Sequence, residues 1–166
     1  MHTIVTGGAL RLRAVLPART RKPPAFPFLE RRLTPRCVFM DIGAADCGLA
    51  LSAASYVERV YAVDVSGAFI ENVLVPLNMR LVLCDGVRIP VPDGVVNLAW
   101  GGSFMAHLHP DDRLEHLKNV RRCLAPGGAY LCAVPGPFRA AGFTSVKGYA
   151  GPVRVPRMLA SYLAAS

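Results

Sequence analysis

Residues 37–48 read CVFMDIGAADCG, and this stretch decides the fold. Its first half, residues 37–42, is a short apolar run of the kind found in strands that are buried on both faces of a parallel sheet. Its second half is rich in small residues, which allow the backbone to approach a ligand closely, and it leads into a helix predicted over residues 44–57. Asp46 is placed to cap that helix. The stretch therefore predicts a strand, a loop and a helix, with the loop at the carboxyl end of the strand.

Outward from this unit, strand patterns alternate with helix patterns along the chain. The further strands are predicted over residues 59–65 (RVYAVDV), 80–84 (RLVLC), 95–100 (VVNLAW) and 129–134 (AYLCAV). Helices are predicted over residues 66–77 and 111–124, and Pro126-Gly127-Gly128 is expected to end the second of them. This alternation predicts an α/β fold, a Rossmann-like, doubly wound and mostly parallel sheet with helices on both faces.

Composition and charge divide the chain into two parts. Its 166 residues fit one domain, and 52% hydrophobic against 18% charged residues exclude disorder of the whole chain. The formal charge of +8 lies almost entirely in residues 1–36, which hold eight basic residues and one acid. We therefore expect a basic, loosely ordered arm over residues 1–36 and a nearly neutral domain over residues 37–166. This imbalance argues against a nucleic-acid-binding domain, although RNA or an anionic surface remains the alternative partner for the arm.

The chain shows no signal for a membrane, a secretory route or a metal. No apolar run reaches the roughly 18–20 residues that a membrane helix needs. The five cysteines lack zinc spacing, so we expect reduced thiols in a cytoplasmic protein. His107, His109 and His116, together with Asp111 and Asp112, suggest a metal site, but they fall at a predicted helix start, and we expect no metal there. His107 or His109 as a general base is the alternative.

Three acids end three successive predicted strands at intervals of about 20 residues, namely Asp41, Asp64 and Asp85. In an open α/β sheet, ligands bind outside the carboxyl ends of the strands, so we expect these carboxylates to share one site. A carboxylate at Asp64 can accept both hydroxyls of a ribose, and one at Asp85 can accept an exocyclic amine such as that of adenine. The spacing therefore points to a nucleoside-containing ligand.

The order of four segments resembles the class I S-adenosylmethionine-dependent methyltransferases, over about residues 37–134. These segments are residues 38–43 (VFMDIG), residues 60–66 (VYAVDVS), residues 85–90 followed by 93–98, and residues 124–128 (LAPGG). The resemblance implies S-adenosylmethionine as cofactor and methyl transfer to an acceptor that the sequence does not identify. It implies no protein nucleophile, because the sulfonium methyl is already activated, and it leaves any catalytic side chain unidentified.

The resemblance also implies a set of cofactor-binding residues. Gly43 and Ala44 would pass against the methionine moiety, with Asp41 anchoring its amino group. Asp64 would hold the ribose, and Asp85 the adenine amine. The backbone around Val65, Cys84 and Gly86 would flank the adenine ring, and Trp100 would face the reacting end of the cofactor. The full set is Asp41, Gly43, Ala44, Asp64, Val65, Cys84, Asp85, Gly86 and Trp100.

The chain departs from the family pattern at several positions. Ala45 and Cys47 stand where the family usually has glycines, and Asn97 replaces a commonly acidic residue. Only 32 residues follow Val134, whereas the family fold usually continues through a helix and two more strands. Residues 140–146 resemble the turn into a sixth strand, and residues 155–165 a last helix. We therefore expect a sheet that is incomplete at its C-terminal edge, which a second copy of the chain would cover as a homodimer.

Two other functions remain open at this point. The altered glycine positions favour a catalytically impaired binding or scaffold protein that keeps the methyltransferase fold. A nicotinamide-dependent oxidoreductase is the other alternative. Its typical G-x-G-x-x-G fingerprint is matched only in part, by Gly43, Ala45 and Gly48.

Overall fold

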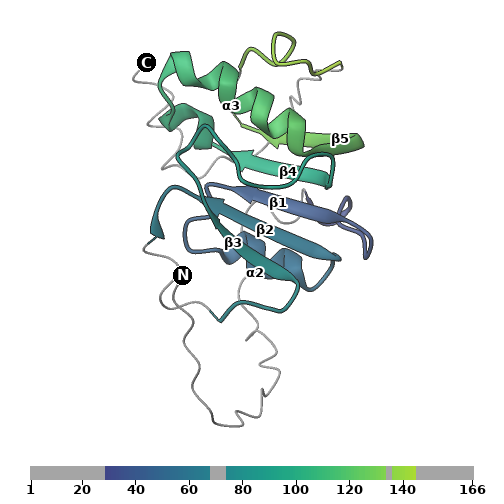
Figure 1. The fold of residues 1–166 in the computed structure, drawn as a ribbon. Coiled ribbons are helices and arrows are strands. Elements are labelled where there is room, and N and C mark those ends of the chain that lie inside the picture. Colours follow the sequence, from purple (N-terminus) through teal and green to yellow (C-terminus); the bar gives the residue numbers. More distant parts are fainter. Residues whose placement is uncertain (1–28, 68–73, 134–135, 145–166) are drawn as a thin grey trace.

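Five parallel strands form one sheet in the order β3-β2-β1-β4-β5 (Figure 1). The computed structural model describes residues 29–67, 74–133 and 136–144. The strands are β1 (Val38–Ile42), β2 (Arg59–Asp64), β3 (Met79–Leu83), β4 (Val96–Gly102) and β5 (Leu124–Cys132). The chain winds outward from β1 in one direction and then, from β4, in the other, so the switch point of the topology lies between β1 and β4.

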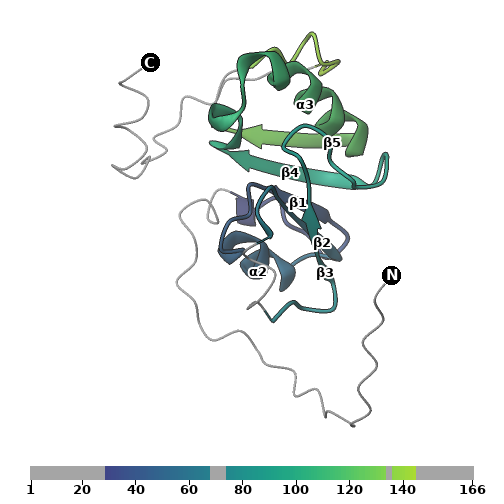
Figure 2. The same ribbon diagram turned by 60° about the vertical axis from the view of Figure 1, so that its left-hand side comes forward.

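Helices cover both faces of this sheet (Figures 1 and 2). Helix α2 (Gly48–Ala54) packs on β1, β2 and β3, and helix α3 (Pro110–Cys123) packs on the other face over β4 and β5. A short 3-10 helix, η2 (Phe104–His107), joins the end of β4 to α3. The prediction of a Rossmann-like, doubly wound α/β fold is therefore confirmed. Neither α2 nor α3 is long and apolar enough to cross a membrane.

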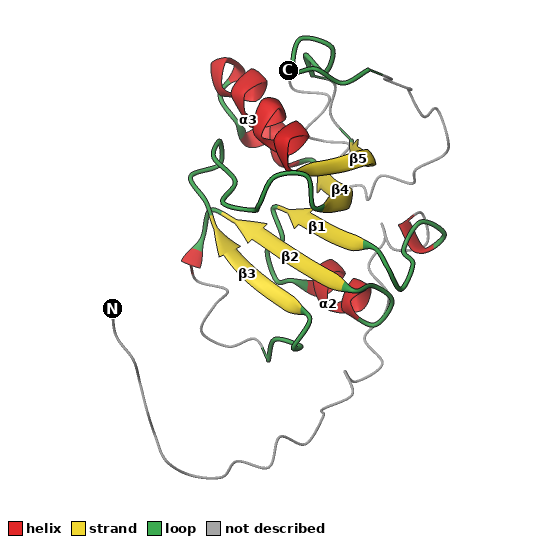
Figure 3. Cartoon of the chain, turned by 45° about the vertical axis from the view of Figure 1, so that its right-hand side comes forward, coloured by secondary structure: helices red, strands yellow, loops and turns green. Residues whose placement is uncertain are grey.

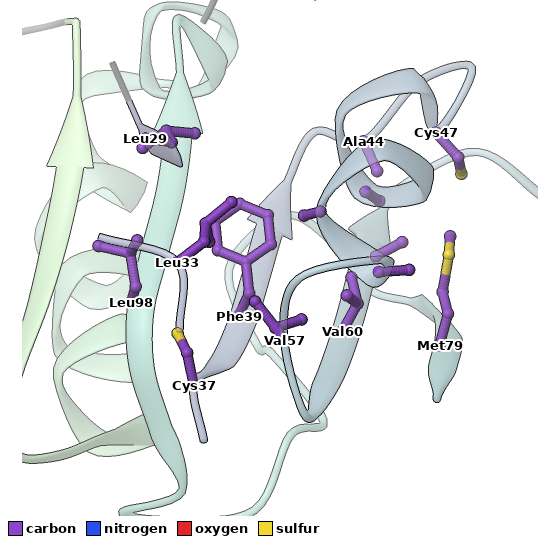
Figure 4. Packing of buried hydrophobic residues seen from close by; sticks show 14 residues of the cluster. Leu29, Leu33, Cys37, Phe39, Ala44, Cys47, Val57, Val60, Met79 and Leu98 are labelled. Atoms are coloured by element: carbon purple, nitrogen blue, oxygen red, sulfur yellow. The ribbon is translucent and has the colours of Figure 1, made fainter. Parts of the chain in front are cut away.

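Successive side chains of the central strand pack into two different apolar layers, because they point to opposite faces of the sheet. Phe39 of β1 belongs to the layer under α2, and Met40 belongs to the layer under α3. Figure 4 shows the first layer, in which Leu29 and Leu33 lie beside Phe39 and Leu98. The short helical turn that carries these two leucines is held by the hydrogen bond from Leu33 N to Leu29 O at 3.2 Å. Residues 29–33 thus pack onto the domain.

The helix predicted over residues 44–57 is wrong at its start, because α2 begins only at Gly48. Ala45 and Cys47 adopt left-handed backbone, with φ of 46° and 57°, and this conformation keeps residues 44–47 in a loop. Asp46 is not the N-cap; its Oδ1 instead accepts a hydrogen bond from Gly48 N at 3.1 Å. Of the helix predicted over residues 66–77, residues 74–77 are not helical, and residues 68–73 lie outside the described residues.

The predicted strand over residues 129–134 begins earlier in the structure, because α3 passes directly into β5 at Leu124. Val96 pairs with Leu124 and Leu98 pairs with Ala129, so the Pro126-Gly127-Gly128 segment forms a bulge within the strand rather than the turn before it. Gly127 has a φ of 77°, and a Cβ at Gly128 would lie 2.7 Å from the carbonyl oxygen of Val96. Only glycine fits both demands of this bulge.

Beyond β5, residues 136–144 form turns, and the described part of the chain contains no sixth strand (Figure 3). β5 is therefore one edge of the described sheet, and β3 is the other. The helix predicted over residues 155–165 lies outside the described residues, and so do residues 1–28 of the arm predicted over residues 1–36. The division into arm and domain stays a prediction.

Asn78 closes the end of α2 and yields a first test. Its Nδ2 donates to the carbonyl oxygens of Ala54 at 2.8 Å and Val57 at 3.0 Å, which have no partner within the helix. We expect Asn78→Ala to lower the free energy of unfolding by about 1–3 kcal/mol, as measured in urea, because two carbonyls lose their donor.

The matched control is Asn119→Ala. Asn119 Nδ2 donates to Glu115 O within the continuous helix α3, so its loss is expected to be neutral or slightly stabilising. Equal effects of the two substitutions would contradict the role assigned to Asn78.

Candidate functional site at the strand ends

The loop after β1 is fastened to the end of β2. Gly43 N and Ala44 N both donate to the carbonyl oxygen of Val63, at 2.8 and 3.1 Å. Gly43 has a φ of 74°, and a Cβ there would lie 2.8 Å from Cδ2 of Phe104, so this position requires glycine. The side chain of Ala44, within the loop, is buried in the apolar layer under α2. The loop therefore has a fixed course across the carboxyl ends of two neighbouring strands.

The carboxylate of Asp64 also holds this loop in place, through side-chain hydrogen bonds. Its Oδ2 accepts from Ala45 N and its Oδ1 from Ser66 N, each at 2.9 Å. Each oxygen has further acceptor capacity, because a carboxylate offers about four lone-pair directions. The space enclosed behind Asp64, towards Leu81 and Cys47, measures only about 10 Å³. A hydroxyl group would therefore reach Asp64 from the strand-end edge.

A similar arrangement follows β3, where Asp85 organises the next loop. Its Oδ1 accepts from Val87 N at 2.9 Å and from Arg88 N at 2.6 Å. The hydrogen bonds from Arg88 N and Val87 N hold the pKa of this exposed carboxyl below its usual value. Asp85 is thus an exposed and ionised acceptor. The neighbouring thiol of Cys84 is half-buried and accepts from Gly86 N at 3.4 Å.

Exposed aliphatic side chains lie between these two acids. Val65 and Leu83, which follow β2 and end β3, are 52% and 53% exposed. A Cβ at Gly86, which has a φ of 90°, would lie 3.3 Å from Cδ2 of Leu108 and 3.5 Å from Cγ1 of Val65. Val65, Gly86 and Leu108 therefore meet at one place. Leu108 was not among the residues predicted for the site.

Asp41 lies inside the protein rather than at the open edge. It is 3% exposed, and its carboxylate is hydrogen-bonded by the backbone of Ala50 in the first turn of α2. Loss of hydration raises its pKa to about 7, against the lowering effect of that hydrogen bond, and the charges of Asp46 and Asp64 raise it further. Asp41 therefore supports the helix that follows the loop.

Trp100 pairs with Asp41 across β1 and β4, and is half-buried. Its indole packs near Gly102 at the end of β4, where a Cβ would lie 3.3 Å from Nε1. Trp100 thus borders the same edge from the β4 side. Phe104, which the sequence did not single out, closes the edge at Gly43 from η2.

The three histidines are not brought together. His116 is fully buried on α3, whereas His107 and His109 are exposed. Within residues 29–67, 74–133 and 136–144, no group of three His, Cys, Asp or Glu side chains is arranged to hold a metal ion.

The raised pKa of Asp41 makes stability depend on pH. Between about pH 4 and pH 7 the native state holds a proton that the unfolded chain has lost, so the free energy of unfolding falls as pH rises through this window. Asp41→Asn removes this loss. We expect the stability of the variant relative to wild type to improve by about 2–3 kcal/mol between about pH 5 and pH 8, as measured by urea unfolding.

Asp46→Asn is the control, because its amide can still accept from Gly48 N and it removes a charge that raises the pKa of Asp41 less than burial does. We expect this variant to keep most of the pH-dependent loss of stability. Parallel stability–pH curves for wild type and Asp41→Asn would refute the buried, neutralised state of Asp41.

The left-handed residues of the loop give a further test. Ala45 is exposed, so Ala45→Gly relieves its backbone without removing a buried side chain, and we expect a gain of up to about 1 kcal/mol in thermal unfolding. Cys47 is 2% exposed, and Cys47→Gly is expected to destabilise because buried packing is lost. A loss of stability in Ala45→Gly would contradict strain at this position.

The comparisons with known proteins point to one protein family. The model of the methyltransferase domain family matches residues 39–128, which contain the strand-end loops after β1, β2 and β3. No curated protein matches the chain.

Solved methyltransferases share the fold. A S-adenosylmethionine-dependent methyltransferase from Aquifex aeolicus is 19% identical, with a TM-score of 0.56 over 70% of each chain. Phosphoethanolamine N-methyltransferase 1 of Haemonchus contortus, solved with phosphoethanolamine and S-adenosylhomocysteine, is 22% identical, with a TM-score of 0.58 over 66% of this chain and 24% of that one. Geranyl diphosphate C-methyltransferase of Streptomyces coelicolor is 21% identical, with a TM-score of 0.54 over 64% and 42%.

This chain spans about half the length of three further solved proteins that it matches. The family model covers more than half of the chain, and the solved methyltransferases share its fold. The chain therefore belongs to the class I S-adenosylmethionine-dependent methyltransferase family, whose cofactor is S-adenosylmethionine.

Proposed function

We propose that the chain binds S-adenosylmethionine across the carboxyl ends of β1, β2 and β3 and takes part in methyl transfer to an acceptor. When bound, the cofactor supplies a methyl group on a sulfonium, which needs no activation by a protein nucleophile. The single observation that carries the proposal is Asp64, whose two oxygens are fixed by the loops on either side and retain acceptor capacity towards the open edge.

The residues around Asp64 fit the nucleoside part of the cofactor. Two ribose hydroxyls are donors, and Asp64 is a fixed acceptor for them. Asp85 is exposed and ionised, as an acceptor for the adenine amine must be. The aliphatic surface of Val65 and Leu108 around Gly86, together with the Cys84 backbone, supplies a face against which an adenine ring would pack.

The methionine part of the cofactor would lie along Gly43 and Ala44, towards Trp100. Here the chain contributes a loop of fixed course, bordered by Phe104, and the negative charge that Asp41 carries above about pH 7. Asp41 would act on the amino group through this charge, because the carboxylate itself is turned towards Ala50. We assign the chain's contribution to orientation of the cofactor and exclusion of water.

The acceptor, cell compartment and assembly belong to the proposal as well. Because β5 is an edge of the described sheet, a second copy of the chain would pair there and complete the acceptor site. None of the five cysteines, which all lie within the described residues, forms a disulfide, and this suits the reducing cytoplasm.

The test is calorimetric titration with S-adenosylmethionine and S-adenosylhomocysteine. We expect wild type to bind in the micromolar range and Asp64→Ala to lose binding by about 100-fold or more, because a charged acceptor and the anchoring of two loops disappear together. Val65→Glu places a charge on the adenine-facing surface without removing a hydrogen bond, and we expect it to weaken binding by at least tenfold with little change in stability.

Glu58→Ala is the control, because Glu58 is an exposed acid directly before β2, at the opposite end of that strand from Asp64. No binding by folded wild type, or binding unaffected by both site variants, would overturn the proposed site. Tight binding without methyl transfer to any acceptor would favour the binding or scaffold function over catalysis.

A further inference from the structure

His116 is the one fully buried histidine of the described chain, and the proposed function leaves it without a task. It lies on the face of α3 that packs on the sheet, and the other buried residues of that face include Leu117 and Val120. Its Nδ1 is 2.9 Å from the carbonyl oxygen of Gly86, which belongs to the loop after β3. A single side chain of α3 thus contacts the backbone of the loop that we assign to adenine.

The partner of this hydrogen bond fixes the form of the imidazole. A carbonyl oxygen only accepts, so Nδ1 must carry the proton. Burial lowers the pKa of His116, more than the hydrogen bond to Gly86 raises it, so the ring is neutral at physiological pH. Nε2 then presents a lone pair, and it has no hydrogen-bond partner among the described residues. The protein thus keeps a polar ring in its interior for one hydrogen bond, where an aliphatic side chain would avoid the cost of burial.

The ring of His116 also contacts the other half of the proposed site. Its centroid lies 5.4 Å from that of Phe104, with the planes inclined by 37°. Phe104 in turn fills the space beside Gly43, where a Cβ would lie 2.8 Å from Cδ2 of the phenyl ring. His116 is therefore one step removed from the loop after β1 and in direct contact with the loop after β3.

We infer that His116 is a positioning residue of the cofactor site: its Nδ1–H holds the backbone of Gly86, and its ring supports Phe104 against Gly43. This inference rests on the proposed function, because it assigns to one buried side chain the relative placement of the adenine-facing and methionine-facing loops. His116 does not touch the cofactor in this arrangement, and it acts only through Gly86 and Phe104.

Two amide substitutions separate this role from simple filling of the core. The side-chain amide of Asn lies close to the position of Nδ1, whereas that of Gln lies close to the position of Nε2. We therefore expect His116→Asn to keep the affinity for S-adenosylhomocysteine within about threefold of wild type, and His116→Gln and His116→Leu to lower it by roughly tenfold. Val120→Ala, a cavity substitution on the same helix, is expected to lower stability and leave the affinity within about threefold.

Two further measurements need no ligand. Hydrogen exchange of Val87 and Arg88, whose amides are bonded to Asp85 beside Gly86, should accelerate in His116→Gln and His116→Leu and stay near the wild-type rate in His116→Asn. The ¹⁵N shifts of the His116 ring should show a neutral imidazole protonated at Nδ1.

The outcomes distinguish the two proposals. If wild type does not bind S-adenosylhomocysteine, the proposed function fails, and exchange at Val87 and Arg88 still decides whether His116 holds the loop. If wild type binds, but the Gln and Asn variants bind equally well and exchange equally fast, the positioning role of His116 is overturned while the proposed function stands. A ring protonated at Nε2 would also overturn it.

Discussion

The carboxylate of Asp64 joins the two loops on which the proposed site depends. Ala45 N and Ser66 N bind its two oxygens, so the turn after β1 and the turn after β2 are held by one side chain at the end of one strand. The parallel register of β1 with β2 brings these strand ends level, from Val38 opposite Arg59 to Ile42 opposite Val63. The backbone bonds from Gly43 and Ala44 to Val63 reinforce this connection. Without Asp64, two backbone N–H groups would need new partners, and the loop would lose its fixed course.

This connection explains how the loop accommodates residues that are not glycine. Ala45 and Cys47 occupy the left-handed region, at a cost of roughly 1–2 kcal/mol each. At Ala45 this cost is offset by the hydrogen bond from its own N–H to Asp64. At Cys47 it is offset by burial of the side chain in the layer under α2. The departures from the family pattern therefore raise the energetic cost of this loop conformation. They also set the first residue of α2, because a helix cannot begin until the left-handed residues have passed.

The strands and the acids at their ends are predictable from the sequence, whereas the contacts across the site are not. Apolar runs such as that of β1 have one interpretation in a parallel sheet, and the ends of parallel strands meet at one edge, so Asp64 and Asp85 are found from spacing alone. The start of α2 and the bulge of β5 depend on backbone conformations at Ala45 and Gly127 that the local pattern does not encode. Leu108, Phe104 and His116 approach the site from elements beyond β4, through tertiary packing. His116 had a usable signal, because it lies four residues before Val120 on the apolar face of α3.

The central claim is that the cofactor binds across the strand ends fastened by Asp64, and amide shift mapping tests it most directly. In ¹⁵N-labelled protein titrated with S-adenosylhomocysteine, we expect the largest changes at Gly43, Ala45, Ser66 and Gly86, which surround the two carboxylates. A hollow of about 690 Å³ between α3 and the loop after β3 is lined by Cys84 and Asp85 and, from α3, by Glu115, Asn119 and Arg122. Changes confined to Glu115, Asn119 and Arg122 would contradict the account, and so would a folded protein that shows no change at all.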